Sequence, residues 1–356
     1  MLYLCVDCGG SKTAAAISDA SGNVVGRGSA GPSNITYLTV DNFIIAITEA
    51  VGAALRQANP SIIFPPIDPE QRLFSAAWFG ISGADSPAAI AKVEQPLSRL
   101  LGIPIGPALL VANDTHLLAA PLRLHPDVHQ VVVVIAGTGS NVVSFKDIKG
   151  KIVEVARVGG WGWILGDEGG GYDVGRETLR QILLLQDKST AHGTPLPKSQ
   201  LINRVLQRFG VSTIMELLGV VYLPDPITSI NDPNAPQNLV RERRISSLSP
   251  LVFESAFDEN DPHALSVLNI TAGKLASQIA ILLGDGPLSS SANRVEAHAS
   301  LISFGGSLVR NTRYRDMLLE NLAQRGHIFK HVAFIDDAPA SGAVGLAKAC
   351  ARNCFR

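Results

Sequence analysis

The chain runs twice through the same order of short segments, and this repeat constrains its fold more than any other feature. An apolar strand is predicted at residues 2–6, followed by a glycine turn, a strand at 13–18, a polar turn and a strand at 23–28. The order begins again with an apolar strand at 131–135 and a glycine turn at 136–140. Apolar runs joined by short turns are typical of hairpins. We therefore expect an α/β protein built from two units with the same strand arrangement.

The remainder of the chain has the apolar spacing of helices. Helices are predicted at 40–59, 175–186, 201–209, 245–257, 263–283 and 342–352. A length of 356 residues exceeds what one hydrophobic core usually serves, so two domains are expected.

The composition is typical of a soluble protein with a large core. Hydrophobic residues make up 46% of the chain, charged residues 17%, and the net charge is −1. No basic patch dominates, so neither nucleic acid nor an anionic membrane is expected as a partner. The chain does not begin like a signal peptide, and no uninterrupted apolar run is long enough to span a bilayer. We expect a cytoplasmic protein.

Four cysteines are too few for a disulfide framework in a chain of this length. Cys5 and Cys8 lie at the end of the first predicted strand, where residues three apart point to opposite faces, so we expect buried, unpaired side chains. The alternative is a zinc site formed by these two with Cys350 and Cys354 from the last helix. The eight histidines show no ligand spacing with cysteine or carboxylate, and no catalytic role is assigned to them.

The first glycine turn has the composition of a phosphate site. Glycines let the backbone approach a ligand closely, and consecutive amide N–H groups form an anion nest. The candidate phosphate contacts are Gly9, Gly10, Ser11, Lys12 and Thr13. Asp7, at the end of the preceding strand, would hold Mg²⁺ through water. The string is not a Walker A loop, and it leads into a strand and not into the helix of a dinucleotide fingerprint.

The second glycine turn repeats this composition with Gly137, Thr138, Gly139 and Ser140. Either turn alone could be just a tight hairpin. Two glycine turns, each with hydroxyl residues and each between apolar strands, favour a phosphate clamp.

Asp114 follows a short apolar strand and precedes a predicted helix. A carboxylate there would project into a crevice at the carboxyl end of the sheet. It could take a proton from an acceptor hydroxyl during phosphoryl transfer. It could equally serve only as the cap of its helix. The spacing leaves both interpretations open.

Residues 159–172 combine two tryptophans with a run of glycines and the pair Asp167-Glu168. Tryptophan faces stack on sugar rings, and carboxylates accept hydrogen bonds from neighbouring hydroxyls. The alternative is a packed turn with buried tryptophans. The adjacent carboxylates favour a polar ligand.

These motifs resemble those of the N-acetylglucosamine kinase / BadF-BadG-BcrA-BcrD ATPase family, within the actin–hexokinase–Hsp70 superfamily. The two glycine turns resemble its phosphate motifs, and Gly305-Gly306-Ser307 resembles its adenosine motif. The Gly-Gly-Trp-Gly and Gly-Asp-Glu-Gly run at 159–169 is the most specific match. The resemblance implies two RNase-H-like domains with a nucleotide and sugar cleft between them. The domains would cover 1–118 and 119–341, with the helix at 342–356 able to return to the first.

The resemblance also implies an ATP- and Mg²⁺-dependent kinase that phosphorylates the 6-hydroxyl of N-acetylglucosamine or a close relative such as glucosamine. Asp114 would be the catalytic base. The implied sugar contacts are Asn34, Ser82, Gly83, Asp114, Ser140, Gly160, Trp161 and Asp167, and the implied adenosine contacts are Gly305, Gly306 and Ser307. A homodimer is also implied.

The sequence departs from the family pattern at a few positions. Cys8 stands where the first glycine of the loop is usual, and Gly170 stands where the Gly-Asp-Glu-Gly motif usually has serine. Residues 222–244 form a longer connection than is typical. Two other functions stay open: an ATPase that activates a dehydratase, which would need cysteines placed for an iron–sulfur cluster, and a non-catalytic sugar sensor.

Overall fold

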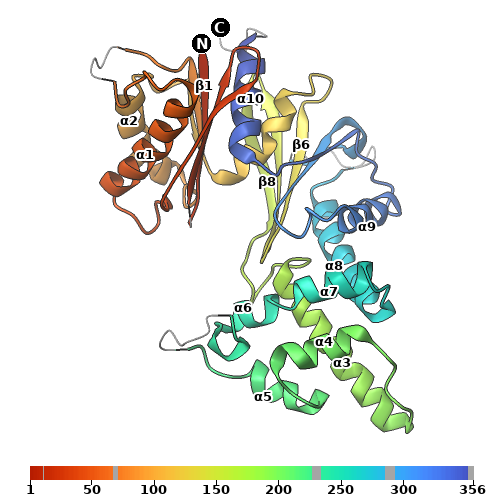
Figure 1. Cartoon of the computed structure of the whole chain (residues 1–356). Coiled ribbons are helices and arrows are strands. Elements are labelled where there is room, and N and C mark those ends of the chain that lie inside the picture. The colour runs from red at the N-terminus through yellow and green to blue at the C-terminus, as the bar shows by residue number, and fades with distance from the viewer. Residues whose placement is uncertain (11, 67–70, 227–233, 285–292, 352–356) are drawn as a thin grey trace.

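The computed structural model describes residues 1–10, 12–66, 71–226, 234–284 and 293–351. It contains two five-stranded sheets, in the orders β3-β2-β1-β4-β5 and β8-β7-β6-β9-β10 (Figure 1). In each sheet the first three strands along the chain are antiparallel neighbours, and the next two add in parallel. The repeated α/β arrangement expected from the sequence is therefore confirmed. The exact division into domains at 118 and 341 stays a prediction.

The strands have the following bounds. The first sheet contains β1 (Leu2–Cys8), β2 (Thr13–Asp19), β3 (Val24–Ala30), β4 (Ala76–Ile81) and β5 (Leu109–Ala112). The second contains β6 (Gln130–Ala136), β7 (Ser140–Ile148), β8 (Lys151–Gly159), β9 (Leu301–Gly305) and β10 (His331–Phe334).

Helices α1 (Val40–Ala58) and α2 (Pro87–Leu101) lie beside the first sheet. Thr39 caps α1, and Ser86 caps α2 with Pro87 at its first turn, as the sequence predicts. Two glycines of β3 let α1 approach, because a Cβ on Gly26 or Gly28 would lie 2.2 or 2.1 Å from a carbonyl oxygen of the helix.

The second sheet carries most of the remaining helices. They are α3 (Gly171–His192), α4 (Gln200–Phe209), α5 (Leu217–Val221), α6 (Arg241–Ser246), α7 (Ser249–Phe257), α8 (Pro262–Ile281) and α9 (Thr312–Ala323). Helices α3 to α6 extend beyond the end of the sheet (Figure 1). The single helix expected at 245–257 is wrong, since α6 ends at Ser246 and α7 restarts at Ser249 with Pro250 in its first turn.

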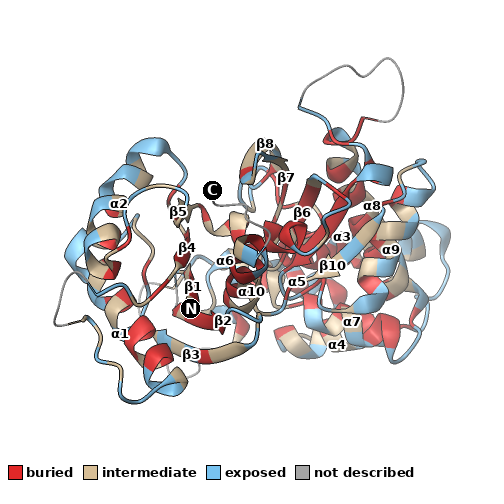
Figure 2. Cartoon of the chain, turned by 90° about the horizontal axis from the view of Figure 1, so that it is seen from above, coloured by how far each residue is buried: buried red, intermediate tan, exposed pale blue. Residues whose placement is uncertain are grey.

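Two elements fill the space between the sheets. The 3-10 helix η1 (Asp114–Arg123) follows β5, and α10 (Ala338–Ala351) ends the described chain. Helix α10 packs on β1, β2, β4 and η1, and its buried residues are prominent in Figure 2. One hydrophobic cluster joins inward residues of both sheets with η1 and α10. Helix α10 thus contacts the first sheet, although it follows the last strand of the second.

Helix α8 is long and apolar enough to cross a membrane by length and composition alone. Its buried residues, such as Val267, Leu268 and Leu275, belong to the large core of the second unit. It packs against α3, α7 and α9. We therefore interpret α8 as a core helix.

The described cysteines are unpaired. Cys5 packs in the cluster between the sheets, whereas Cys8 packs in the core beneath α1, so the two side chains point to opposite faces as predicted. Cys350 lies on α10 and contacts the cluster that contains Cys5. Cys354 lies outside the described residues.

We expect Gly342→Ala to destabilise the protein. The new Cβ would lie 2.3 Å from the sulfur of Cys5, so α10 or β1 would have to move. Overpacking of this kind costs about 1–3 kcal/mol in the free energy of unfolding. Denaturant unfolding measures the difference.

The partner change Cys5→Ala removes the sulfur, so the double variant should recover much of the loss. Gly219→Ala is the matched control, because a Cβ there would meet no atom within 4 Å. Equal losses in Gly342→Ala with and without Cys5→Ala would contradict the close approach of α10 to β1.

Candidate functional site

The first glycine turn joins β1 to β2 at the edge where β1 ends. The amide of Gly9 donates to the carbonyl of Lys12 (3.0 Å), and the carbonyl of Gly9 accepts from the amide of Ser33 (3.0 Å). The Thr13 hydroxyl donates to the carbonyl of Gly31 (2.6 Å) and is fully buried. This side chain therefore closes the β2–β3 hairpin and does not face a ligand. Ser11 lies outside the described residues.

Four of the sequence-predicted residues gather beside this turn. The amide of Ser82 donates to the carbonyl of Cys8 (2.9 Å), which ties the end of β4 to the end of β1. Gly83 has φ +86° and lies against Asn34, since a Cβ there would be 2.8 Å from the Asn34 carbonyl oxygen Oδ1. The Ser82 hydroxyl donates a hydrogen bond to Oδ2 of Asp114. Asn34, Ser82, Gly83 and Asp114 thus form one polar group.

Asp114 is not the cap of the following helix. The cap is Asn113, whose side-chain oxygen accepts from the amide of Thr115 (3.1 Å). Asp114 is the first residue of η1, and its carboxylate is directed to Ser82. The interpretation that Asp114 only caps a helix is therefore wrong, and its carboxylate is available to a ligand.

Glycines fix the position of η1, and therefore of Asp114, between the two sheets. A Cβ on Gly80 in β4 would lie 2.4 Å from Leu117, and a Cβ on Gly305 in β9 would lie 2.7 Å from Leu118. Both leucines belong to η1. Helix η1, which begins with Asp114, is thus packed closely between β4 and β9.

Asp7, Asp114 and Asp337 bring three carboxylates together. Asp7 ends β1, Asp114 begins η1, and Asp337 caps α10 by accepting from the amide of Ala340 (2.9 Å). Burial raises the pKa of Asp7 to about 6, repulsion from Asp114 and Asp337 adds to the rise, and Lys12 opposes it. Asp337 is ion-paired with Arg27, so the carboxylates of Asp7 and Asp114 are the oxygen donors that suit a hard cation such as Mg²⁺.

The second glycine turn packs directly on the start of α3. The amide of Gly171 donates to the carbonyl of Gly137 (2.8 Å), and the amide of Tyr172 donates to the carbonyl of Thr138 (2.9 Å). Gly170 must be glycine, because a Cβ there would lie within 2.7–2.9 Å of the Gly139 backbone. Helix α3 therefore begins at Gly171, earlier than the predicted residue 175, because these contacts fix its first turn.

Asp167 lies against the second turn in a left-handed conformation, with φ +61°. Its Oδ1 accepts from the amide of Ser140 (3.2 Å), and a Cβ on Gly139 would lie 2.5 Å from its carboxylate. Burial raises its pKa. Few residues other than glycine, asparagine and aspartate adopt this conformation, and such strain is concentrated at functional sites.

The predicted sugar contacts next to Asp167 differ in their exposure and in their hydrogen bonds. The amide of Gly160 donates to the carbonyl of Ser140 (3.1 Å), while the Ser140 hydroxyl donates to the carbonyl of Glu168 (2.8 Å). The Ser140 side chain is therefore engaged inside the turn. Trp161 is 75% exposed, so its ring lies free on the surface beside this group.

The adenosine-type motif meets the second turn. Gly306 has φ +104° and approaches the backbone of Ala136, while the Ser307 hydroxyl is the nearest neighbour of a Cβ built on Gly137 (4.0 Å). Ser307 also lines a cavity of about 470 Å³ between the 307–311 turn and α7, together with Phe253 and Asn311. This cavity is open and has an aromatic wall.

Sequence reasoning missed Asp173, which supports the glycine run from α3. Its carboxylate is fully buried; Oδ2 accepts from the amide of Gly169 (3.0 Å), and Oδ1 accepts from Arg176 (2.8 Å) and Lys274 (3.1 Å). Lys274 also binds Glu177 (3.1 Å). Asp337 was missed as well, although an acidic residue just before a helix containing Pro339 is a recognisable N-cap signal.

We expect Asp7→Asn to stabilise the protein at pH 8 by about 2 kcal/mol when Mg²⁺ and nucleotide are absent. Because the folded protein raises the pKa of Asp7 above its unfolded value, this group lowers stability as pH rises from about 4 to about 6. The gain should disappear near pH 4, where Asp7 is largely protonated in the folded protein. Denaturant unfolding at both pH values tests this.

Asp316→Asn, at an exposed position of α9, is the control and should change little. A loss of stability in Asp7→Asn at pH 8 would contradict the raised pKa, because it would show that the ionised carboxylate is stabilised in the folded protein.

Comparisons with known proteins show which proteins this chain is similar to. The N-acetyl-D-glucosamine kinase of Dictyostelium discoideum is 27% identical over 257 residues, which cover 72% of this chain and 71% of that protein. An N-acetylmuramic acid/N-acetylglucosamine kinase of Clostridium acetobutylicum is 32% identical over 184 residues, 51% of this chain and 54% of that protein. A solved structure from Porphyromonas gingivalis, assigned as an N-acetylglucosamine kinase, covers 99% of both chains with a TM-score of 0.59 and 22% identity.

The structural likeness concerns the fold, whereas the family follows from the sequence. The model of one protein family matches residues 4–347, nearly the whole chain. The resemblance inferred from the glycine turns and the Gly-Asp-Glu-Gly run is thereby confirmed: the chain belongs to the BadF/BadG/BcrA/BcrD ATPase family.

Proposed function

We propose that this protein is an ATP-dependent amino-sugar kinase that transfers the γ-phosphoryl group to the 6-hydroxyl of N-acetylglucosamine. The observation that carries the proposal is the position of Asp114. Its carboxylate is directed away from its own helix, hydrogen-bonded to Ser82, beside the first glycine turn. The names of the two curated relatives support an amino sugar as the acceptor.

In this proposal Asp114 acts as the general base. The sugar hydroxyl donates its hydrogen bond to Asp114, and its oxygen attacks the γ-phosphorus. The bond between the γ-phosphorus and the bridging oxygen of the β-phosphate breaks to release ADP, and the hydroxyl proton passes to the carboxylate. Ser82 fixes the orientation of that carboxylate through its own hydrogen bond. A well-placed base of this kind contributes about 10²- to 10⁴-fold to the rate.

The glycine turns supply backbone donors to the phosphates. The amides of Gly10, Thr138 and Gly139 make no backbone hydrogen bond to another described residue, which leaves them free to donate to phosphate oxygens. Lys12 adds a positive charge at the first turn. The adenine ring would enter the cavity beside Ser307 and face Phe253.

Asp7 would hold Mg²⁺ through water, with Asp337 nearby. The set of carboxylate oxygens and the raised pKa of Asp7 fit a divalent cation, because its charge would relieve their mutual repulsion. When bound, Mg²⁺ neutralises charge on the β- and γ-phosphates.

The sugar contacts proposed from the sequence divide between two groups. Asn34, Ser82 and Gly83 lie with Asp114, whereas Gly160 and Asp167 lie on the second turn. Trp161 is exposed next to the second group and would cover the sugar after a local movement. A cytoplasmic location and a homodimer remain part of the proposal.

The dehydratase-activating alternative is weakened by the cysteines. Cys5 and Cys8 are fully buried in separate cores, so neither can bridge an iron–sulfur cluster between subunits. The sensor alternative is weakened by Asp114, because a protein that only binds sugar has no need of a free carboxylate beside a phosphate turn.

We expect Asp114→Asn to lower kcat by about 10²- to 10⁴-fold, because the amide cannot accept the proton. A coupled assay of ADP release with N-acetylglucosamine, glucosamine, N-acetylmuramic acid and glucose measures the turnover of each sugar. Asp316→Asn on α9 should keep the activity of the unchanged protein. Sugar-dependent turnover retained in Asp114→Asn, or absent from the unchanged protein with every sugar, would overturn the proposal.

We expect Asp173→Asn to raise KM for ATP severalfold, since the glycine run that packs on the second turn loses its buried anion. The lost hydrogen bonds to a charged group should also reduce stability by about 1–3 kcal/mol. Glu177→Gln is the matched control: it shares Lys274 but does not touch Gly169. The two variants should lose stability alike, and only Asp173→Asn should change KM. An unchanged KM in Asp173→Asn would show that the buried anion does not position the turn.

A further inference from the structure

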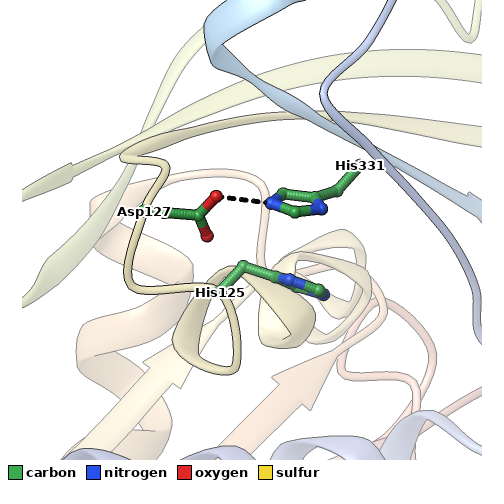
Figure 3. Close-up of side chains that lie close together, drawn as sticks. All are labelled: His125, Asp127 and His331. Carbon is green, nitrogen blue, oxygen red and sulfur yellow. Dashed lines mark hydrogen bonds and ion pairs between the residues drawn. The ribbon is translucent and has the colours of Figure 1, made fainter.

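Three polar side chains meet on the surface of the second unit, away from the glycine turns. His125 and Asp127 come from the connection between η1 and β6, and His331 is the first residue of β10 (Figure 3). Nε2 of His331 lies 2.7 Å from Oδ2 of Asp127. The imidazole rings of His125 and His331 are stacked, with centroids 4.3 Å apart. The proposed kinase chemistry uses none of these residues.

The spacing of these groups is close to that of a metal site. One ligand atom from each residue can be chosen so that all three lie within 4.8 Å of one another. Around a tetrahedral zinc ion the ligand atoms are roughly 3.4 Å apart, given metal–ligand bonds near 2.1 Å. The side chains of Asp127 and His331 are 43% and 29% exposed. Small rotations of these side chains, which move their ligand atoms by about an ångström, therefore meet little resistance.

The charged neighbours of the cluster are one carboxylate and one ammonium group. Asp127 supplies the negative charge that would attract a cation, and Nε2 of His331 lies beside it. Lys330 lies 3.0 Å from Asp127 and presently compensates its charge. A metal ion would take the place of this ammonium group.

We propose that His125, Asp127 and His331 form a binding site for a divalent transition-metal ion of the zinc class. Two imidazoles and one carboxylate are typical zinc ligands, whereas Mg²⁺ and Ca²⁺ prefer sites built wholly of oxygen. The two imidazole nitrogens distinguish this site from the carboxylate group at Asp7, which offers oxygen donors. A bound ion ties the η1–β6 connection to the start of β10, two segments far apart in the sequence.

The sequence contains two of the three ligands of this site in the string His125-Pro126-Asp127. The prediction from sequence does not treat this His-x-Asp spacing as a ligand pair, and the proposal departs from it at this position. His331 could not be assigned as the third ligand, because only the pairing of β10 with β9 brings it to the cluster.

Zinc titration of the chelator-treated protein in excess Mg²⁺ tests the proposal, since Mg²⁺ occupies the carboxylates around Asp7. We expect one Zn²⁺ per chain at this site, and substitution by Co²⁺ should give the visible absorption of a four- or five-coordinate ion. His331→Ala and His125→Ala should each weaken binding at least about tenfold. His298→Ala, an exposed histidine outside the cluster, should leave binding unchanged.

Lys330→Gln gives a test in the opposite direction. Removal of the competing ammonium group should tighten Zn²⁺ binding by up to about fivefold, the equivalent of one exposed ion pair. Thermal melting without metal checks that each variant folds. The proposal is overturned if the unchanged protein takes up no Zn²⁺, or if His331→Ala and His298→Ala bind it equally. Kinase activity is not part of this test, so its outcome is independent of the proposed function.

Discussion

The close packing of two helices between two sheets determines where Asp114 and Asp337 lie relative to the two glycine turns. Helix η1 approaches β4 and β9 at Gly80 and Gly305, and α10 approaches β1 at Gly342. At each of these points a side chain would collide with the neighbouring element. The glycines therefore set the distance between the sheets, and with it the separation of the two glycine turns that end β1 and β6.

This packing has an electrostatic consequence. Helices η1 and α10 begin at the same end of the interface, so Asp114 and Asp337 are brought towards Asp7 at the end of β1. Burial raises the pKa of Asp7, and repulsion from Asp114 and Asp337 adds to the rise, so an ionised Asp7 lowers the stability of the protein when no cation is bound. Such an arrangement is retained where a cation or a proton has to be bound, in keeping with a site for phosphoryl transfer.

The sequence predicted the structural features that depend on residues close together in the chain. Alternating apolar runs and glycine turns gave the two hairpins, and the caps at Thr39 and Ser86 were readable from local signals. It could not predict contacts made only by the folded chain. The buried anion of Asp173 depends on Lys274 from α8, and the cluster at Asp127 depends on His331 from β10. Likewise, Asn113 and not Asp114 takes the cap of η1, a choice between adjacent residues that spacing leaves open.

The hydrogen bonds of the Thr13 and Ser140 hydroxyls show that these side chains support the glycine turns. From the sequence, Thr13 and Ser140 were predicted to donate hydrogen bonds to phosphate or sugar. In the structure both hydroxyls donate to carbonyl oxygens inside the protein. They hold the shape of each turn, and the exposed donors are then mainly backbone amides. Since backbone donors need no particular side chain, the turns can bind phosphate without selecting the acceptor. In the proposed kinase, discrimination among sugars would therefore come from Asn34, Asp167 and the surroundings of Asp114.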